Sequence, residues 1–219
     1  MKTSKIKFIT ANLALAALLA VLAGCVSKSY DKGAATSEAL QTSADAVAET
    51  SVKVNDVLAA LNNLTFKSEG DLRDQFDAFV SAIGNLDNSS DKLDSKVAEM
   101  QAKASVYFES WSNQLAAIQS DELRKRSIER RDEVTTKLAD VTMSYQGVKN
   151  SLKPFMSDVK DIQTYLGTDL TVGGLATVKD IVAKTKVDAV PLRDSIKKLQ
   201  ASFSDLSASL SPVMPSPDK

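Results

Sequence analysis

After residue 32, the sequence is dominated by apolar or small side chains that recur at alternating spacings of three and four residues. This spacing places successive side chains on one face of an α-helix, and its regular form is the a/d seam of a coiled coil. A half-buried β-strand would instead alternate at every second residue. Four such seams follow one another, so the pattern predicts an all-α protein.

The four seams differ in length. The first contains Leu40, Ala44, Val47, Ser51, Val54, Leu58 and Leu61. The second contains Leu72, Phe76, Phe79, Ile83, Leu86, Ser90, Leu93, Val97, Met100 and Ala104, then Phe108, Trp111, Leu115 and Ile118 after one extra step of four. The third contains Val134, Leu138, Val141, Tyr145, Val148, Leu152, Phe155, Val159, Ile162 and Leu166. The fourth contains Leu175, Val178, Val182, Thr185, Ala189, Leu192, Ile196, Leu199, Phe203, Leu206 and Leu210.

Turn signals separate the seams at residues 62–70, 119–122 and 167–174. Ser68 or Asp71 is a candidate N-cap for the second helix, and Asp121 for the third. Short connections between long helices make neighbours antiparallel. The sequence therefore predicts an elongated up-down-up-down helical bundle.

Two prolines and several small seam residues modify this picture. Pro154 and Pro191 lie inside seams that keep their phase, which predicts kinks and not breaks. The small or polar seam residues are Ala44, Ser51, Ser90, Thr185 and Ala189. Such residues weaken an isolated bundle, and they also permit close helix approach or self-association.

The N-terminus has the layout of an export signal. Residues 1–7 are basic, and residues 8–22 form an apolar run that is shorter than the ~20 residues of a membrane span. Leu22-Ala23-Gly24-Cys25 then resembles the lipobox of bacterial lipoprotein precursors. The resemblance implies a diacylglycerol on the Cys25 thiol, cleavage before Cys25 and acylation of the new amine. Several acyl chains hold a protein on a membrane where one binds marginally. The alternative is a plain signal peptide with a chance cysteine.

These signals divide the chain into four parts. Residues 1–24 are the signal peptide, 25–32 a lipidated polar tether, 33–210 the helical bundle, and 211–219 a proline-containing tail that should fray. Val26 follows the cysteine where some lipoproteins carry aspartate. In enteric-type bacteria this resembles lipoproteins exported to the periplasmic face of the outer membrane, in preference to the inner membrane.

The composition argues against several classes of function. The chain has no histidine and one cysteine, which removes most nucleophile–base pairs, zinc sites and disulfide frameworks. Carboxylate-bridged metal sites in bundles also use histidine. Removing Lys2, Lys5 and Lys7 from 27 basic residues, against 28 acidic ones, leaves a net charge of about −4. A nucleic-acid binder would show a basic excess. We therefore predict no enzyme, no cofactor or metal and no nucleic-acid partner.

The unequal seam lengths predict an overhang of residues near 107–131 at the anchored end. This segment carries the aromatic residues Tyr107, Phe108 and Trp111 and the basic residues Arg124, Lys125, Arg126, Arg130 and Arg131. Aromatic and basic groups together suit a lipid–water interface, or contact with a membrane-proximal partner. In the alternative, which the interleaved acids favour, the aromatics complete the seam. The arginines then form a solvated face with Glu122, Glu129, Asp132 and Glu133.

Two segments carry a family resemblance. They are Tyr107-Phe108-Glu109-Ser110-Trp111, followed by residues 123–131, and Leu152-Lys153-Pro154-Phe155, followed by residues 159–166. Together they resemble a family of Gram-negative helical lipoproteins that is catalogued only as a domain of unknown function. The resemblance implies a helical lipoprotein facing the periplasm, and it transfers no activity and no site residues.

The sequence thus indicates a membrane-anchored lipoprotein with a non-catalytic helical-bundle role as a spacer, adaptor or envelope assembly factor. Its partners would be the membrane, through the lipid, and an unidentified protein, because long amphipathic helices offer extended surfaces to partner helices. The alternative function is a carrier of lipid or another hydrophobic ligand, with the bundle opening around an acyl chain. Well-matched seams speak against a wide cavity of that kind.

Overall fold

The computed structural model describes the backbone of residues 9–66 and 71–210, and the side chains of residues 31–66 and 71–210. The side chain of Cys25, the candidate cap Ser68 and the predicted tail 211–219 lie outside these residues. The described backbone forms five α-helices and no strand. They are α1 (Ile9–Phe66), α2 (Arg73–Leu115), α3 (Asp121–Leu166), α4 (Val172–Thr177) and α5 (Lys179–Leu210).

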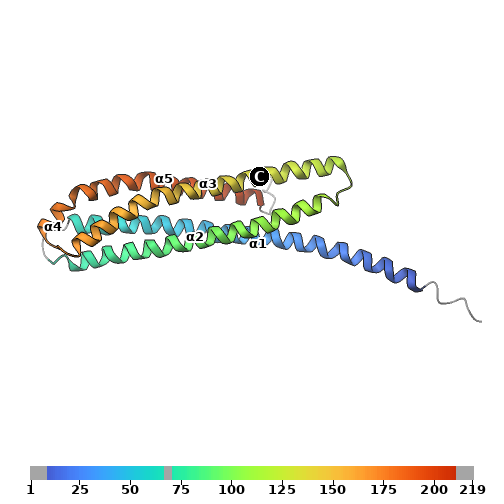
Figure 1. Ribbon diagram of the computed structural model, residues 1–219, viewed down its shortest axis with the longest axis horizontal. Helices are drawn as coiled ribbons and strands as arrows, with labels where there is room; N and C mark the ends of the chain where they lie inside the picture. The colour runs from blue at the N-terminus through green and yellow to red at the C-terminus, as the bar shows by residue number, and fades with distance from the viewer. Residues whose placement is uncertain (1–8, 67–70, 211–219) are drawn as a thin grey trace, which may run out of the picture.

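Four of the helices are long and lie side by side in an elongated antiparallel bundle (Figure 1). Helix α1 packs mainly against α2, and α3 packs mainly against α5, so the bundle consists of two hairpins. Contacts between α1 and α5 and between α2 and α3 join the hairpins. The short helix α4 lies in the connection from α3 to α5. The predicted all-α, up-down-up-down bundle is confirmed.

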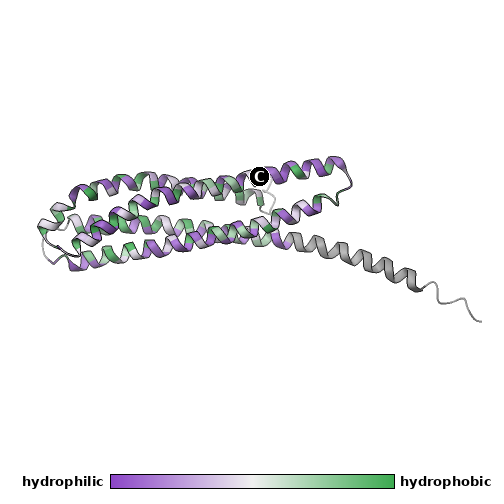
Figure 2. Cartoon of the chain, viewed as in Figure 1, coloured by the Kyte–Doolittle hydropathy of each residue, from purple (hydrophilic) through white to green (hydrophobic). Residues whose placement is uncertain are grey.

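The apolar seams of α3 and α5 form half of the core. Each predicted seam residue of these helices is buried except Leu138 and Leu210, which are partly buried and pack against the core. Figure 2 shows hydrophobic and hydrophilic residues alternating along every long helix, as expected for helices with one buried face. Both helices continue through their internal prolines, Pro154 and Pro191, without a break.

The predicted seam of α1 is wrong by one residue along one side of the helix. The prediction placed Ala44, Ser51 and Leu58 in the interior, but these three are only partly buried. The buried residues are their preceding neighbours Ser43, Thr50 and Val57. In α2, likewise, Ser89 is buried where Ser90 was predicted.

Hydrogen bonds between α1 and α2 explain this shift. The Ser43 hydroxyl donates to the carbonyl oxygen of Lys96 on α2 at 2.9 Å. The hydroxyls of Thr50 and Ser89 lie 2.9 Å apart across the same interface. A side chain as short as serine reaches a backbone carbonyl of the next helix only if the two backbones approach closely. These bonds also satisfy hydroxyl groups that would otherwise be costly to bury.

The second hairpin uses the same arrangement. The hydroxyls of Ser144 and Ser202 lie 2.9 Å apart, and those of Ser151 and Ser195 lie 3.2 Å apart. These pairs join α3 to α5 at intervals of seven residues. Each hairpin is therefore closed by small hydroxyl side chains, and the large apolar side chains fill the space between the hairpins.

The helix starts differ from the predicted caps. Helix α3 is capped by Ser120, whose hydroxyl accepts a hydrogen bond from the Leu123 N–H at 3.3 Å. Asp121 lies in the first turn, where its carboxylate suits the helix dipole. The N-cap of α2 is Leu72, which gives no side-chain cap, while Asp71 accepts from the Arg73 N–H at 3.0 Å.

Two further features of the chain course were not predicted. Residues 172–174 were assigned to a turn, but they begin α4, whose N-cap Thr171 accepts a hydrogen bond from the Gly174 N–H at 3.1 Å. Helix α1 continues without interruption from Ile9, so residues 25–32, predicted as a tether, have helical backbone. The N-terminal part of α1 therefore extends directly from the bundle (Figure 1).

Candidate functional site

The connection between α2 and α3 projects beyond the end of α5, on the side where the N-terminal part of α1 leaves the bundle (Figure 1). We call residues 107–131 the α2–α3 end. Helix α5 stops at the level of Arg130, whose guanidinium donates to the carbonyl oxygen of Ser209 at 2.6 Å. Lys137 also donates to the Ser209 hydroxyl, at 2.5 Å. The part of α3 before residue 130 therefore has no α5 beside it.

The sequence of α3 changes where α5 ends. Helix α3 begins at Asp121, but its apolar seam begins only at Val134. The heptad positions before Val134 that face the same way are polar, namely Arg124, Ser127 and Arg131. Ser127 and Arg131 on this face bond to Trp111 and Ser112 of α2, so polar contacts with α2 replace the apolar seam at the point where α5 ends.

Three aromatic side chains pack against one another in the last turns of α2. Tyr107 lies 5.6 Å, ring centre to ring centre, from both Phe108 and Trp111. The Phe108 and Trp111 rings are 6.4 Å apart and nearly parallel, at 9°. The Trp111 indole N–H donates to the Ser127 hydroxyl on α3 at 3.0 Å, which ties the two helices together. Burial raises the pKa of the Tyr107 hydroxyl.

Each predicted basic residue of this end has an acidic partner on α3. The pairs and their N···O distances are Arg124–Asp121 at 3.0 Å, Arg126–Glu122 at 2.7 Å, Lys125–Glu129 at 4.0 Å, Arg130–Glu133 at 2.7 Å and Arg131–Asp132 at 2.8 Å. Exposed pairs of this kind contribute about 0–1 kcal/mol each. Residues 121–133 carry five basic and five acidic side chains, so this segment is net neutral.

Arg124 has a further role in the turn. Its guanidinium donates to the carbonyl oxygen of Ile118 through Nη2 at 2.6 Å and Nε at 3.1 Å. A cation near the C-terminus of α2 also suits the helix dipole. The guanidinium of Arg124 therefore stabilises the α2–α3 connection, and its donors are bonded to Ile118 and Asp121.

The structure also shows apolar exposure at this end, which the sequence analysis missed. Leu123 is 57% exposed and Ile128 is 37% exposed. In the connection itself Ala116 and Ala117 are exposed, and Ile118 is half-buried. Leu123 lies two turns of α3 before Arg130 and on the same side, so it faces the space that α5 would fill if it were longer. In the sequence, the apolar run Leu115–Ile118 could have indicated this exposed surface. We had interpreted Leu115 and Ile118 as the end of the second seam.

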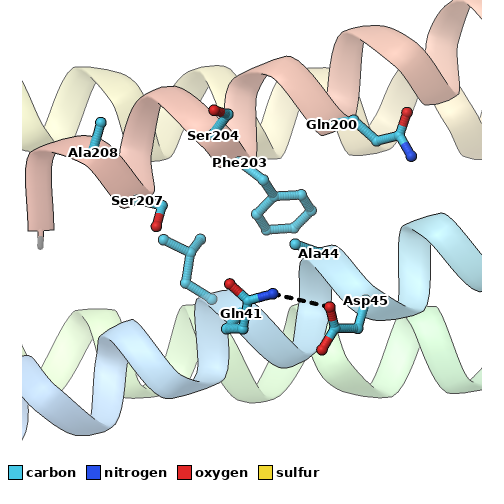
Figure 3. A pocket seen from close by; sticks show the side chains of 9 residues that line it. Gln41, Ala44, Asp45, Gln200, Phe203, Ser204, Ser207 and Ala208 are labelled. Carbon is cyan, nitrogen blue, oxygen red and sulfur yellow. Dashed lines mark hydrogen bonds between the residues drawn. The ribbon is translucent and has the colours of Figure 1, made fainter.

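A groove lies between α1 and α5 near the end of α5, with a volume of about 570 Å³ (Figure 3). Its lining residues are Leu40, Gln41, Ala44, Asp45, Gln200, Phe203, Ser204, Ser207 and Ala208. Figure 3 shows Gln41 donating to the Asp45 carboxylate, a bond of 2.9 Å. Leu40 and Phe203 are buried parts of the core, and much of the remaining lining is polar.

The groove has a simple cause. Farther along the same interface, Lys186 donates to Asn62 on α1 at 3.1 Å and Arg193 donates to Asn55 at 2.6 Å. These long side chains bridge α1 and α5 and cover the space between them. The positions seven and fourteen residues after Arg193 are Gln200 and Ser207; both line the groove, and Ser207 is too short to bridge the two helices.

Two titratable groups elsewhere have strongly shifted pKa values. Burial and a hydrogen bond to Asp94 raise the pKa of Tyr145 to about 12. Hydrogen bonds from Lys103 and Lys96 lower the pKa of Glu99 to about 2. Tyr145 joins α3 to α2, and Glu99 lies on the exposed face of α2. Neither group changes protonation near neutral pH, so both are structural.

In the part of the chain that the structure describes, no group of three His, Cys, Asp or Glu side chains is arranged to hold a metal ion. In the same part, no helix combines the length and the apolar character that crossing a bilayer requires.

Comparison with known proteins adds one finding. No curated protein matches the chain. The family model described as Protein of unknown function (DUF2959) matches residues 28–210, which include all of the bundle from the start of the described α1 side chains to the end of α5. The match covers most of the 219 residues, and the chain therefore belongs to this family.

Proposed function

We propose that the protein is a lipid-anchored protein of the bacterial cell envelope, whose helical bundle serves as a spacer, adaptor or assembly factor without catalysing a reaction. One observation carries this proposal. The lipobox-like segment Leu22-Ala23-Gly24-Cys25 lies on α1, the same helix that forms part of the bundle. Acyl chains on Cys25 would hold the bundle at one end and leave its long faces accessible.

The interior supports a non-catalytic role. Its buried side chains are apolar apart from small hydroxyls such as Ser43, Thr50 and Thr185, which make hydrogen bonds. The charged groups of the described residues lie on the surface and largely in ion pairs. An active site would need polar groups gathered in a sheltered cavity. Long exposed helical faces suit recognition of a partner helix.

The carrier function has less support. The groove between α1 and α5 is open, and Gln41, Asp45, Gln200 and two serines form most of its rim. An acyl chain binds in an enclosed, mainly apolar cavity. The core residues Leu40 and Phe203 already occupy the space in which such a cavity would form.

Replacing Cys25 by serine tests the anchor directly. In a Gram-negative host fed a labelled fatty acid, we expect the wild-type chain to take up label and to sediment with membranes. The Cys25→Ser chain should take up no label and leave the membrane fraction. Cys25 is the single cysteine of the chain, so no other thiol can accept the lipid. Ser27→Ala serves as the neighbouring control and should behave as wild type.

Label on the Cys25→Ser chain, or an unlabelled wild-type chain, would contradict the proposed anchor. Density separation of the membranes then decides the compartment, and we propose the outer membrane because Val26 follows the cysteine. Crosslinking in intact cells, followed by mass spectrometry, tests the adaptor role. A discrete partner that is lost from Cys25→Ser cells supports it, and the absence of any crosslinked partner contradicts it.

A further inference from the structure

We propose that the α2–α3 end rests on the surface of the same membrane that holds the anchor. Its contact would be made by Leu123, Ile128 and the connecting residues 116–118, with zwitterionic lipid as the partner. The inference rests on the proposed function, because it requires acylated Cys25, and it adds a second point of membrane contact. It differs from the contact that the sequence alone suggests, in which the basic residues face the lipid.

A contact between α1 and α2 sets the level of this end along the bundle. A Cβ atom at Gly33 would lie 3.2 Å from the ring of Tyr107, so these two residues are side by side. Cys25 precedes Gly33 by eight residues, and Leu115 follows Tyr107 by eight residues. The two helices are antiparallel, so both intervals run the same way. At 1.5 Å per residue each spans about 12 Å.

The α2–α3 connection is therefore level with the backbone of Cys25. Figure 1 shows the same relation, because the connection and the N-terminal part of α1 project from one end of the bundle. Acyl chains attached at Cys25 enter the bilayer at its surface. A segment at the same level as Cys25 then meets the headgroup region of that bilayer.

The exposed side chains of this end suit that position. Leu123 and Ile128 are 57% and 37% exposed, and Ala116 and Ala117 in the connection are exposed as well. Among the described residues no helix covers Leu123, because α5 ends at the level of Arg130. Trp111, near the end of α2, has its indole N–H bonded to Ser127, and tryptophan is enriched at membrane interfaces.

The charge balance of residues 121–133 indicates whether the contact requires anionic lipid. The five basic side chains of residues 121–133 are each paired with an acid of the same segment, and the segment is net neutral. A polybasic segment would bind anionic lipid with a strength that falls as salt rises. A neutral, apolar contact is instead independent of anionic lipid and of salt.

A fluorescent probe on the intact, lipidated protein tests this contact. The full-length Leu123→Cys chain is purified with its anchor, labelled with an environment-sensitive dye and placed in phosphatidylethanolamine–phosphatidylcholine vesicles. The lipid occupies Cys25, so the new thiol is the single reactive one. Val187→Cys is the matched control, because Val187 is an aliphatic residue that is 68% exposed and lies near the opposite end of the bundle.

We expect the dye at position 123 to shift to shorter wavelength and to lose most of its emission to headgroup-spin-labelled lipid, at low and at high salt. The dye at position 187 should show neither change. Trp111, the single tryptophan, provides the same readout in the unmodified chain when brominated lipids are used.

Two results would overturn the inference while the anchor stands. One is a protein that floats with the vesicles while its position-123 dye is as unquenched as the dye at 187. The other is a crosslink in cells from position 123 to a protein and not to lipid, which would make this end a protein-docking surface. Failure of the purified chain to carry lipid or to float with vesicles would instead remove the proposed function itself.

Discussion

Replacing Phe155 by alanine is expected to lower the free energy of unfolding by about 3–5 kcal/mol. Phe155 is fully buried in the α3 seam, among the largest side chains of the core. Removing its ring leaves a cavity between two hairpins that are each held by their own hydrogen bonds, so the helices can close the gap only in part. Urea unfolding of the Cys25→Ser chain, followed by circular dichroism, measures the change.

Phe66→Ala is the control for this prediction. Phe66 lies at the end of α1 and is 74% exposed, with the Lys186 ammonium 5.5 Å from its ring centre. The same chemical change at this surface position should alter the free energy of unfolding by no more than about 0.5 kcal/mol. Equal losses in the two variants would mean that Phe155 is not part of a packed core.

Replacing Gly174 by alanine is expected to destabilise the α3–α5 connection. A Cβ atom at Gly174 would lie 2.0 Å from the carbonyl oxygen of Asp169, far inside van der Waals contact. That neighbour is backbone, so residues 169–174 must move as a unit. This movement would strain the Thr171 cap of α4 and the burial of Leu175. We expect a loss of about 1–3 kcal/mol, the usual cost of overpacking.

The neighbouring glycine provides a matched control. A Cβ atom at Gly173 would lie 3.5 Å from the Thr171 hydroxyl oxygen, an ordinary contact with a side chain. Gly173 is exposed and helical, so Gly173→Ala should be neutral or stabilising by up to about 1 kcal/mol. Thermal unfolding of the two variants separates these outcomes. Equal melting temperatures would show that the connection adapts freely and that the close contact at Gly174 is unimportant.

The sequence predicted the buried helix face most accurately where the seam residues are large. Apart from Tyr145, Thr185 and Ala189, the predicted seams of α3 and α5 consist of leucine, isoleucine, valine and phenylalanine, whose burial dominates the energy of folding. The alternation of three and four residues therefore identifies the buried face without knowledge of the partner helix. Both internal prolines were placed correctly inside helices because the seam phase continues past them.

The prediction failed in α1 because the choice lay between similar neighbours. Ser43 and Ala44, or Thr50 and Ser51, differ little in hydrophobicity. Which of them is buried depends on α2, through the carbonyl oxygen of Lys96 and the hydroxyl of Ser89. These partners are about 40 to 50 residues away in the chain and carry no pattern visible in α1 itself.

At the α2–α3 end, the sequence identified the overhang but not its surface. The overhang followed from seam lengths, which are a property of the pattern. The interleaved acids had already indicated that the basic residues are paired, and the structure shows each of them in an ion pair with an acid one, three or four residues away on α3. The sequence did not indicate that Leu123 is exposed, because its exposure depends on where α5 ends. The groove between α1 and α5 was also missed, since short side chains on two distant segments give no local signal.

The small side chains that pair within each hairpin can be crosslinked to test the two-hairpin bundle. Three double-cysteine variants of the Cys25→Ser chain are oxidised under mild conditions and read by mass spectrometry. Thr50→Cys with Ser89→Cys, and Ser144→Cys with Ser202→Cys, replace hydroxyls that lie 2.9 Å apart, and both pairs should form disulfides in the folded monomer. Thr50→Cys with Ser202→Cys joins different hairpins and should remain reduced. Disulfide formation in the mixed pair, with none in the two matched pairs, would contradict the two-hairpin bundle.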